Sequence, residues 1–147
     1  MLFYEIRSGT WASPTGAILV TGCEAGNDNV AKDMNNPASV GLRDRGPLPP
    51  GRYSIGPLGY QAAVRSQGCM LTPFPENDML GRSGFYLHLR NSRHLAPDGT
   101  NASSDGCITF AAFSELASIT AAAVADDRTV MVVASLHEPA LTAPYPA

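Results

Sequence analysis

The stretch Ser103-Ser104-Asp105-Gly106-Cys107-Ile108-Thr109-Phe110 is the one from which the organisation of this chain can be worked out. It joins a polar loop to an apolar segment that soon turns helical, and a glycine and a cysteine lie at the junction. A strand-like run ends in His88, 19 residues before Cys107, and this spacing accommodates a strand, a loop and a return. We therefore predict that Cys107 is a nucleophile and that His88 is its base.

The chemistry of Cys107 depends on its neighbours, because a thiol is a useful nucleophile only as the thiolate. A helix that begins a few residues later would favour the thiolate through its dipole, and an imidazole would favour it as base or ion-pair partner. Gly106 removes a side chain beside the sulfur, so a substrate backbone can approach. The amides of Gly106 and Cys107 are candidates for an oxyanion hole, with Ser104 and Asp105 in support. The pattern alone leaves open that Cys107 is a small, packed hydrophobe.

The composition indicates one mostly β domain. The chain has 147 residues, of which 44% are hydrophobic, enough for a single core. It contains 14 glycines and 12 prolines, and only 16% of its residues are charged. This combination favours a loop-rich β fold over a helical bundle. We predict a single catalytic domain over residues 1–138 and a Pro- and Ala-rich tail over residues 139–147.

Charge and motif content argue against several classes of function. The net charge is −3 and there is no basic block, so we expect no nucleic-acid partner. No apolar run approaches the roughly 18 residues of a membrane span, and Glu5 and Arg7 interrupt the N-terminal one, so we expect neither membrane insertion nor a signal peptide. There is no His-Glu-x-x-His, no Cys-x-x-Cys pair and no glycine-rich phosphate loop. We therefore expect no metal and no other cofactor.

The cysteine count excludes a disulfide scaffold. Cys23, Cys69 and Cys107 cannot all pair with one another. A Cys23–Cys69 bridge stays open at this point, and both residues are otherwise expected to be structural.

Alternation and turn residues predict short strands separated by loops. A hairpin is expected between residues 2–7 and 17–21, with a turn from residue 11 and a long loop over residues 22–37. The prolines of residues 46–51 exclude this stretch from a central strand. Residues 58–68 fit either a helical turn or another strand. The other predicted strands are residues 52–55, 69–72, 85–89 and 129–134, of which the last is β-branched and typical of a central strand.

Residues 111–125 are predicted to form the one main helix, because apolar residues recur there at steps of three and four. Thr109 is its candidate N-cap. The predicted apolar face carries Phe113, Leu116, Thr120 and Val124.

Beyond these local patterns, the chain resembles a known family. A strand-end histidine followed by a Ser-x-Gly-Cys element is similar to the active-site signature of L,D-transpeptidases, and the wider chain resembles the L,D-transpeptidase-like effector domains delivered by type VI secretion. Four stretches carry the resemblance in family order: Gly22–Gly26 with Asn35–Pro37, Gly46–Ile55, Met79–His88 and Ser103–Ile108.

The resemblance implies a mostly β, α+β fold of the L,D-transpeptidase type, a β-sandwich or barrel with one main helix after the cysteine. It implies an antibacterial enzyme that attacks the L,D-linked carbonyl of peptidoglycan stem tetrapeptides through Cys107. The acyl-thioester would be resolved by water, giving L,D-carboxypeptidase activity, or by a D-amino acid, giving exchange. The implied partners are peptidoglycan stems, the type VI secretion apparatus and a cognate immunity protein. We expect synthesis in the cytoplasm and action in the periplasm of target bacteria.

The chain departs from the family pattern around the histidine. Asp105 stands where housekeeping L,D-transpeptidases have a second histidine, and an acidic residue there is common in the effector branch. Leu89 follows His88, where the family usually has glycine. The loop after His88 is long and contains His94, which is a rival base and a candidate substrate contact.

Other candidate residues have two interpretations each. Arg82, Ser83 and Arg90 are candidates for substrate binding, because stem peptides carry carboxylates that arginine binds bidentately. The arginines are alternatively solvated surface charges. Asp105 is a turn former or orients the imidazole, and we favour the turn.

Two other functions remain open on the sequence alone. One is a non-catalytic module of the same fold that binds peptidoglycan or a partner protein. The other is a cysteine amidase or endopeptidase that cuts elsewhere in the stem. The masses of the reaction products distinguish the two enzymes, and a binding module would bind muropeptides without forming a thioester adduct.

Overall fold

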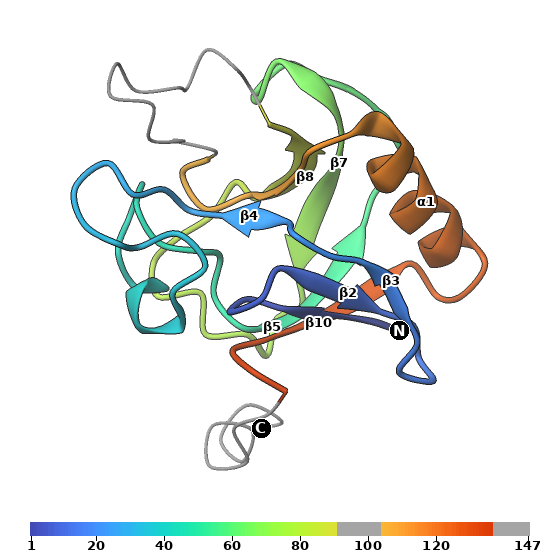
Figure 1. Cartoon of the computed structure of the whole chain (residues 1–147), viewed down its shortest axis with the longest axis horizontal. Helices are drawn as coiled ribbons and strands as arrows, with labels where there is room; N and C mark the ends of the chain where they lie inside the picture. The colour runs from blue at the N-terminus through green and yellow to red at the C-terminus, as the bar shows by residue number, and fades with distance from the viewer. Residues whose placement is uncertain (91–103, 137–147) are drawn as a thin grey trace.

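One mixed β-sheet organises the protein, and a single α-helix packs against it (Figure 1). The structure is a computed structural model that describes residues 1–90 and 104–136. The helix α1 spans Phe113–Val124, and a short 3-10 helix spans Pro37–Ser39. The strands are β1 (Leu2–Glu5), β2 (Thr10–Ala12), β3 (Ile18–Val20), β4 (Glu24–Ala25), β5 (Gly51–Ile55), β6 (Gly59–Gln61), β7 (Ser66–Pro73), β8 (Tyr86–Leu89), β9 (Ile108–Phe110) and β10 (Thr129–Val133).

The strand order is β3-β2-β1-β10-β5-β7-β8-β9-β4, with β6 paired to β7. Strand β10 lies in the middle of one half, parallel to β1 and antiparallel to β5, as its β-branched sequence predicted. Strand β7 joins that half to the second one, which contains β8, β9 and β4. The mostly β, α+β class is confirmed, and the sheet is open because β3 and β4 end it without pairing to each other.

The N-terminal hairpin differs from the predicted one. Strand β1 pairs with β2 and β2 pairs with β3, so residues predicted as a turn form a middle strand. Trp11, the central residue of β2, is fully buried. The long loop over residues 22–37 also contains β4, which pairs with β9. A two- or three-residue strand is too short for alternation to reveal it.

The helix is in its predicted place, but its buried face is rotated from the predicted one. The buried residues are Leu116, Ile119 and Ala123, whereas Phe113 and Val124 are about half exposed. Thr109 is not the N-cap; it lies in β9 and donates its hydroxyl hydrogen to the carbonyl of Glu24 at 2.8 Å. The N-cap is Ala112, whose amide donates to the Glu115 carboxylate at 3.3 Å.

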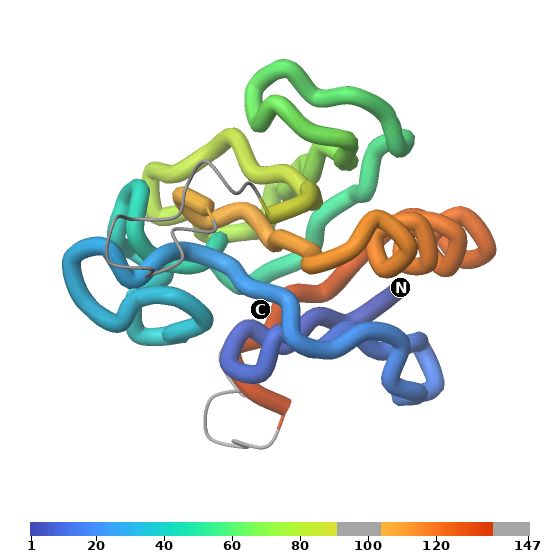
Figure 2. Tube along the Cα trace, turned by 45° about the horizontal axis from the view of Figure 1, so that its top comes forward, coloured from blue at the N-terminus to red at the C-terminus, as the bar shows by residue number. Residues whose placement is uncertain are grey.

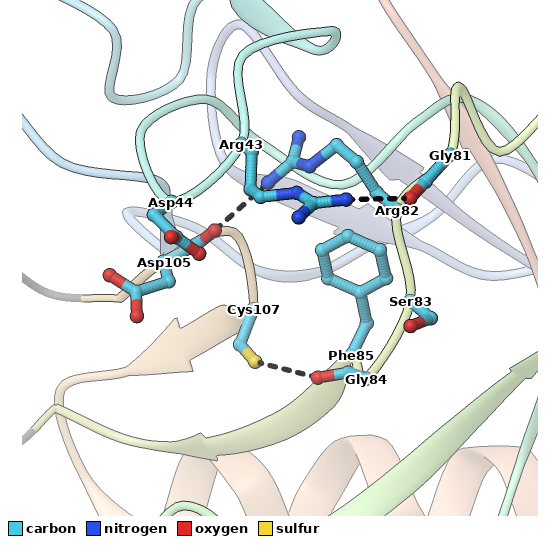
Figure 3. A pocket seen from close by; sticks show the side chains of 9 residues that line it. All are labelled: Arg43, Asp44, Gly81, Arg82, Ser83, Gly84, Phe85, Asp105 and Cys107. Carbon is cyan, nitrogen blue, oxygen red and sulfur yellow. Dashed lines mark hydrogen bonds between the residues drawn. The ribbon is translucent and has the colours of Figure 1, made fainter.

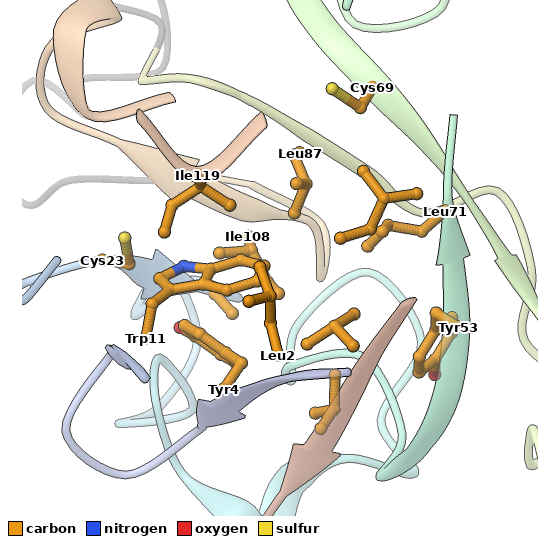
Figure 4. Close-up of a cluster of buried hydrophobic side chains, with 14 of the residues drawn as sticks. Leu2, Tyr4, Trp11, Cys23, Tyr53, Cys69, Leu71, Leu87, Ile108 and Ile119 are labelled. Carbon is orange, nitrogen blue, oxygen red and sulfur yellow. The ribbon is translucent and has the colours of Figure 1, made fainter. Parts of the chain in front are cut away.

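The core lies between α1 and the sheet (Figure 4). Tyr4, Trp11 and Phe110 form its aromatic part, with ring centroids 5.1 Å apart for the first pair and 5.9 Å for the second. Cys23 and Cys69 belong to the core, and all three cysteines are free. Cys23 and Cys69 are therefore two separate thiols and do not form a disulfide bridge.

Long loops gather at the end of the molecule opposite α1 (Figures 1 and 2). There the chain around residues 26–50 lies beside residues 78–85 and the segment that leads into β9. Within the described ranges, no helix has the length and apolar character needed to cross a bilayer.

Candidate active site

Strands β8 and β9 lie side by side and parallel, so the strand that carries His88 is the direct neighbour of the strand that follows Cys107. Leu87 is in register with Ile108, and both side chains are fully buried in the core (Figure 4). Because alternate residues point to opposite faces, His88 leaves β8 on the other face, and so does Cys107 just before β9. The Cys107 Sγ accepts a hydrogen bond from the backbone amide of Tyr86 at 3.3 Å. His88 is in register with Thr109, two residues beyond Cys107, and it is not among the residues that line the cavity at Cys107.

The protonation of His88 follows from its backbone contact. Its Nδ1 lies 2.7 Å from the carbonyl oxygen of Leu89, and the residue is 5% exposed. A carbonyl oxygen only accepts, so Nδ1 carries the hydrogen and donates it. In the neutral ring, Nε2 then holds the lone pair.

Cys107 lies at the edge of a cavity of about 340 Å³ (Figure 3). The residue is only 7% exposed, yet its sulfur faces the cavity and not the packed core. The other lining residues come from two loops and from the turn before β9: Arg43, Asp44, Gly81, Arg82, Ser83, Gly84, Phe85 and Asp105.

Burial raises the pKa of the Cys107 thiol to about 11. This net pKa includes an upward contribution from the Asp105 carboxylate and downward contributions from the amides of Tyr86 and Cys107 and from the Arg82 guanidinium. The helix contributes nothing at this distance, since α1 begins at Phe113, beyond β9, and a helix dipole falls off within about one turn. The expected activation by the helix dipole is therefore wrong, and an imidazole base is needed at neutral pH.

Arg82 joins the chain segments that form the cavity through hydrogen bonds to their backbone carbonyls. Its side chain is buried, and its two terminal nitrogens donate to four backbone carbonyls, those of Val40, Pro47, Gly46 and Asp105, at 2.6–2.9 Å. The guanidinium also lies 5.1 Å from the centre of the Phe85 ring. With both terminal nitrogens occupied, the bidentate carboxylate contact that we expected of Arg82 is not available. Its position instead makes it the scaffold of the site.

Ser104 and Gly106 shape the turn that presents Cys107. The Ser104 hydroxyl donates to the carbonyl of Cys107 at 2.6 Å and accepts from the amides of Gly26 and Gly106. The Gly106 amide is therefore occupied and is not the oxyanion donor that we predicted. Gly106 has φ +140, and a Cβ there would lie 2.6 Å from Arg82 Nη2 and 2.7 Å from the Phe85 ring. Glycine is required for this packing, and not for a substrate's approach as we expected.

The remaining predicted residues fall into three groups. Ser83 and Asp105 line the cavity with exposed side chains, and the Asp105 carboxylate forms no turn contact within the described ranges. Arg90 does not line it: its Nε pairs with the Glu24 carboxylate at 2.5 Å and its Nη2 donates to the carbonyl of Gly22. The proposed role of Arg90 in substrate binding is replaced by one in joining β4 to β8. His94 lies outside the described residues.

Arg43 and Asp44, which no sequence motif predicted, also border the cavity (Figure 3). They precede the proline-rich turn in a loop with several other charges. No local signal distinguishes them, because the orientation of that loop depends on the Arg82 contacts. In the described parts of the chain, no group of three His, Cys, Asp or Glu side chains is arranged to hold a metal ion.

Comparison with known proteins identifies the family of this chain. A family model, the Tlde1 domain, matches residues 25–135, which include the cavity, β8, β9 and α1. Searches of curated proteins and of solved structures found no match. The match covers well over half of the chain, so this protein belongs to the Tlde1 domain family of type VI secretion effectors.

Proposed function

We propose that this protein is a cysteine L,D-carboxypeptidase or L,D-transpeptidase that acts on peptidoglycan stem tetrapeptides. The observation that carries the proposal is the position of Cys107 at the edge of a cavity, directly before the strand that pairs with the one carrying His88. Membership of the effector family supports an antibacterial role. The partners we propose are the secretion apparatus, peptidoglycan stems in the periplasm of target bacteria, and a cognate immunity protein.

The first half of the reaction forms the acyl-enzyme. His88 Nε2 takes the proton of Cys107 Sγ as the sulfur attacks the L,D-linked carbonyl carbon, and an S–C bond forms. The C–N bond to D-alanine then breaks, and the proton on His88 passes to the leaving amine. The Cys107 amide is the donor that we assign to the oxyanion, because Ser104 occupies that of Gly106.

The second half releases the product. A water molecule attacks the thioester, gives its proton to His88, and leaves the stem as a carboxylic acid while the thiol regains its hydrogen. A D-amino acid attacks in the same way and is left joined to the stem by a new amide. The contact from Nδ1 to Leu89 supports this cycle because it keeps the lone pair on Nε2 in the neutral ring.

Digestion of purified tetrapeptide muropeptides tests the proposal. Wild-type protein should release D-alanine, with product masses that match tripeptide stems or exchanged tetrapeptides. Cys107→Ala should abolish turnover, and His88→Ala should lower it at least 100-fold, within the usual range for removal of an acid–base group. The buried Cys69→Ala variant is the matched control, since its thiol lies in the core and does not line the cavity.

Other outcomes would point elsewhere. Products cut at a different bond would indicate an amidase or endopeptidase. Muropeptide binding without turnover or a thioester mass adduct would indicate a binding module. Full activity of His88→Ala together with loss in His94→Ala would move the base to His94.

A further inference from the structure

We propose that Arg43, Asp44 and Asp105 form a subsite beside Cys107 for a zwitterionic α-amino-acid group, one that carries an ammonium and a carboxylate on the same carbon. The inference rests on the proposed function and extends it, because it names the residues that select the substrate. Nothing in the sequence pattern identified this set of three.

The three charged side chains meet at the same cavity as the nucleophile (Figure 3). Asp44 and Asp105 both line it, and the Arg43 side chain extends to the carbonyl of Gly81. All three residues are exposed at the cavity. A small molecule bound there would contact both signs of charge at once.

None of these three side chains forms an ion pair within the described residues, although the Asp44 and Asp105 carboxylates offset part of the lowering that burial imposes on the pKa of Arg82. The arginines of the neighbouring segments have partners: Arg45 pairs with Asp33 at 2.8 Å and Arg52 with Glu76 at 2.7 Å. Within residues 1–90 and 104–136, Arg43 forms no ion pair, and its single contact is an exposed 3.3 Å hydrogen bond to the carbonyl of Gly81. The Asp44 and Asp105 carboxylates accept no hydrogen bond from a described residue. They are therefore available to a ligand.

The mixture of charges determines the chemistry of the ligand. A ligand with only a carboxylate would be attracted by Arg43 but repelled by Asp44 and Asp105. A ligand with only an ammonium would be attracted by the two aspartates but repelled by Arg43. A zwitterionic group avoids both when its carboxylate faces Arg43 and its ammonium faces Asp44 and Asp105. The buried Arg82 already donates to carbonyls and does not compete for the ligand's carboxylate.

Two parts of the proposed reaction carry such a group. One is the free end of a diaminopimelate side chain in the donor stem, and the other is a free amino acid that acts as acceptor. Their shared chemistry is what the subsite recognises, and kinetic experiments separate the two sources.

The donor is tested with three tetrapeptides that differ only at the third residue: diaminopimelate, diaminopimelate amidated at its side-chain carboxyl, and lysine. Wild-type protein should favour the diaminopimelate donor over the amidated and lysine donors by about 10- to 100-fold in kcat/KM. This factor corresponds to one charge-assisted contact that is desolvated when the ligand binds. Arg43→Gln should reduce the preference over the amidated donor to near one, and Asp44→Asn should reduce kcat/KM for both diaminopimelate donors. Arg65→Gln, an exposed arginine away from the cavity, should keep the wild-type preference.

The acceptor is tested by the ratio of exchange to hydrolysis with a free D-amino acid and with its amide. If Arg43→Gln changes this ratio and leaves the donor preference intact, the subsite serves the acceptor. If neither the donor preference nor the ratio changes in Arg43→Gln and Asp44→Asn, the inference is overturned.

Binding separates this inference from the proposed function. Calorimetry with Cys107→Ala measures the affinity for the diaminopimelate and lysine stems without chemistry. A preference for diaminopimelate that disappears on adding Arg43→Gln supports the subsite even when wild-type protein shows no turnover. Turnover with equal affinity for both stems, together with an exchange ratio that Arg43→Gln leaves unchanged, retains the enzyme and refutes the subsite.

Discussion

Replacing Arg82 tests whether this residue is a scaffold or a substrate ligand. The side chain is 7% exposed and donates four hydrogen bonds of 2.6–2.9 Å to carbonyls from three separate segments of the chain. Truncation to alanine leaves these carbonyls without their donor and opens a cavity beneath Phe85. A hydrogen bond to a charged group contributes about 1.5–3 kcal/mol, but water entering from the adjacent cavity restores part of each loss. We therefore expect Arg82→Ala to lower the free energy of unfolding by about 3–5 kcal/mol.

The effect should be visible in urea denaturation and in thermal melts. For a chain of this size, each kcal/mol corresponds to roughly 2–4 °C, so the melting temperature should fall by about 6–20 °C. Arg82→Lys should recover only part of the loss, because an ammonium has three donors and no planar fork. Arg65→Ala, an exposed control, should stay within about 0.5 kcal/mol of wild type. Near-normal stability of Arg82→Ala combined with a raised KM for muropeptides would refute the scaffold role and restore the carboxylate-binding one.

Two further predictions concern the turn and its thiol. Gly106→Ala should destabilise the protein by about 2–4 kcal/mol in urea denaturation, because it adds backbone strain at φ +140 and a clash with Arg82 and Phe85. The control Gly59→Ala should be close to neutral, since a Cβ at that position meets nothing within 4 Å. Equal effects of the two substitutions would contradict the assigned packing. Alkylation of the native protein by iodoacetamide should modify Cys107 before Cys23 and Cys69, and its rate should keep rising with pH up to about pH 11 because the thiol is protonated below its raised pKa. A rate plateau near pH 7, measured by peptide mass mapping, would show instead a preformed thiolate. The same raised pKa means that the contribution of Cys107 to stability is complete below the pKa of about 9 of an exposed thiol and declines as the pH rises toward 11.

Local patterns predicted the elements that are long or strongly biased. The β-branched run at β10, the strand that ends in His88 and the helix after Cys107 were all expected from their residues, and the structure contains each of them. The short elements were missed: β2 was expected to be a turn, and β4 a loop. A strand of two or three residues has too few positions to show a period, and its existence depends on the neighbour with which it pairs.

The sequence by itself determined the mostly β class and the resemblance to an effector family, and it predicted the pairing of His88 with Cys107. These properties are local, because they reside in consecutive residues and in their order along the chain. Only the tertiary structure decided which charges serve the site. It buried Arg82 among four carbonyls, tied Arg90 to Glu24, and left Arg43 and Asp44 beside the sulfur. The physical reason is that an arginine's role depends on which acceptors lie within a few ångströms, and here those acceptors come from segments far away along the chain.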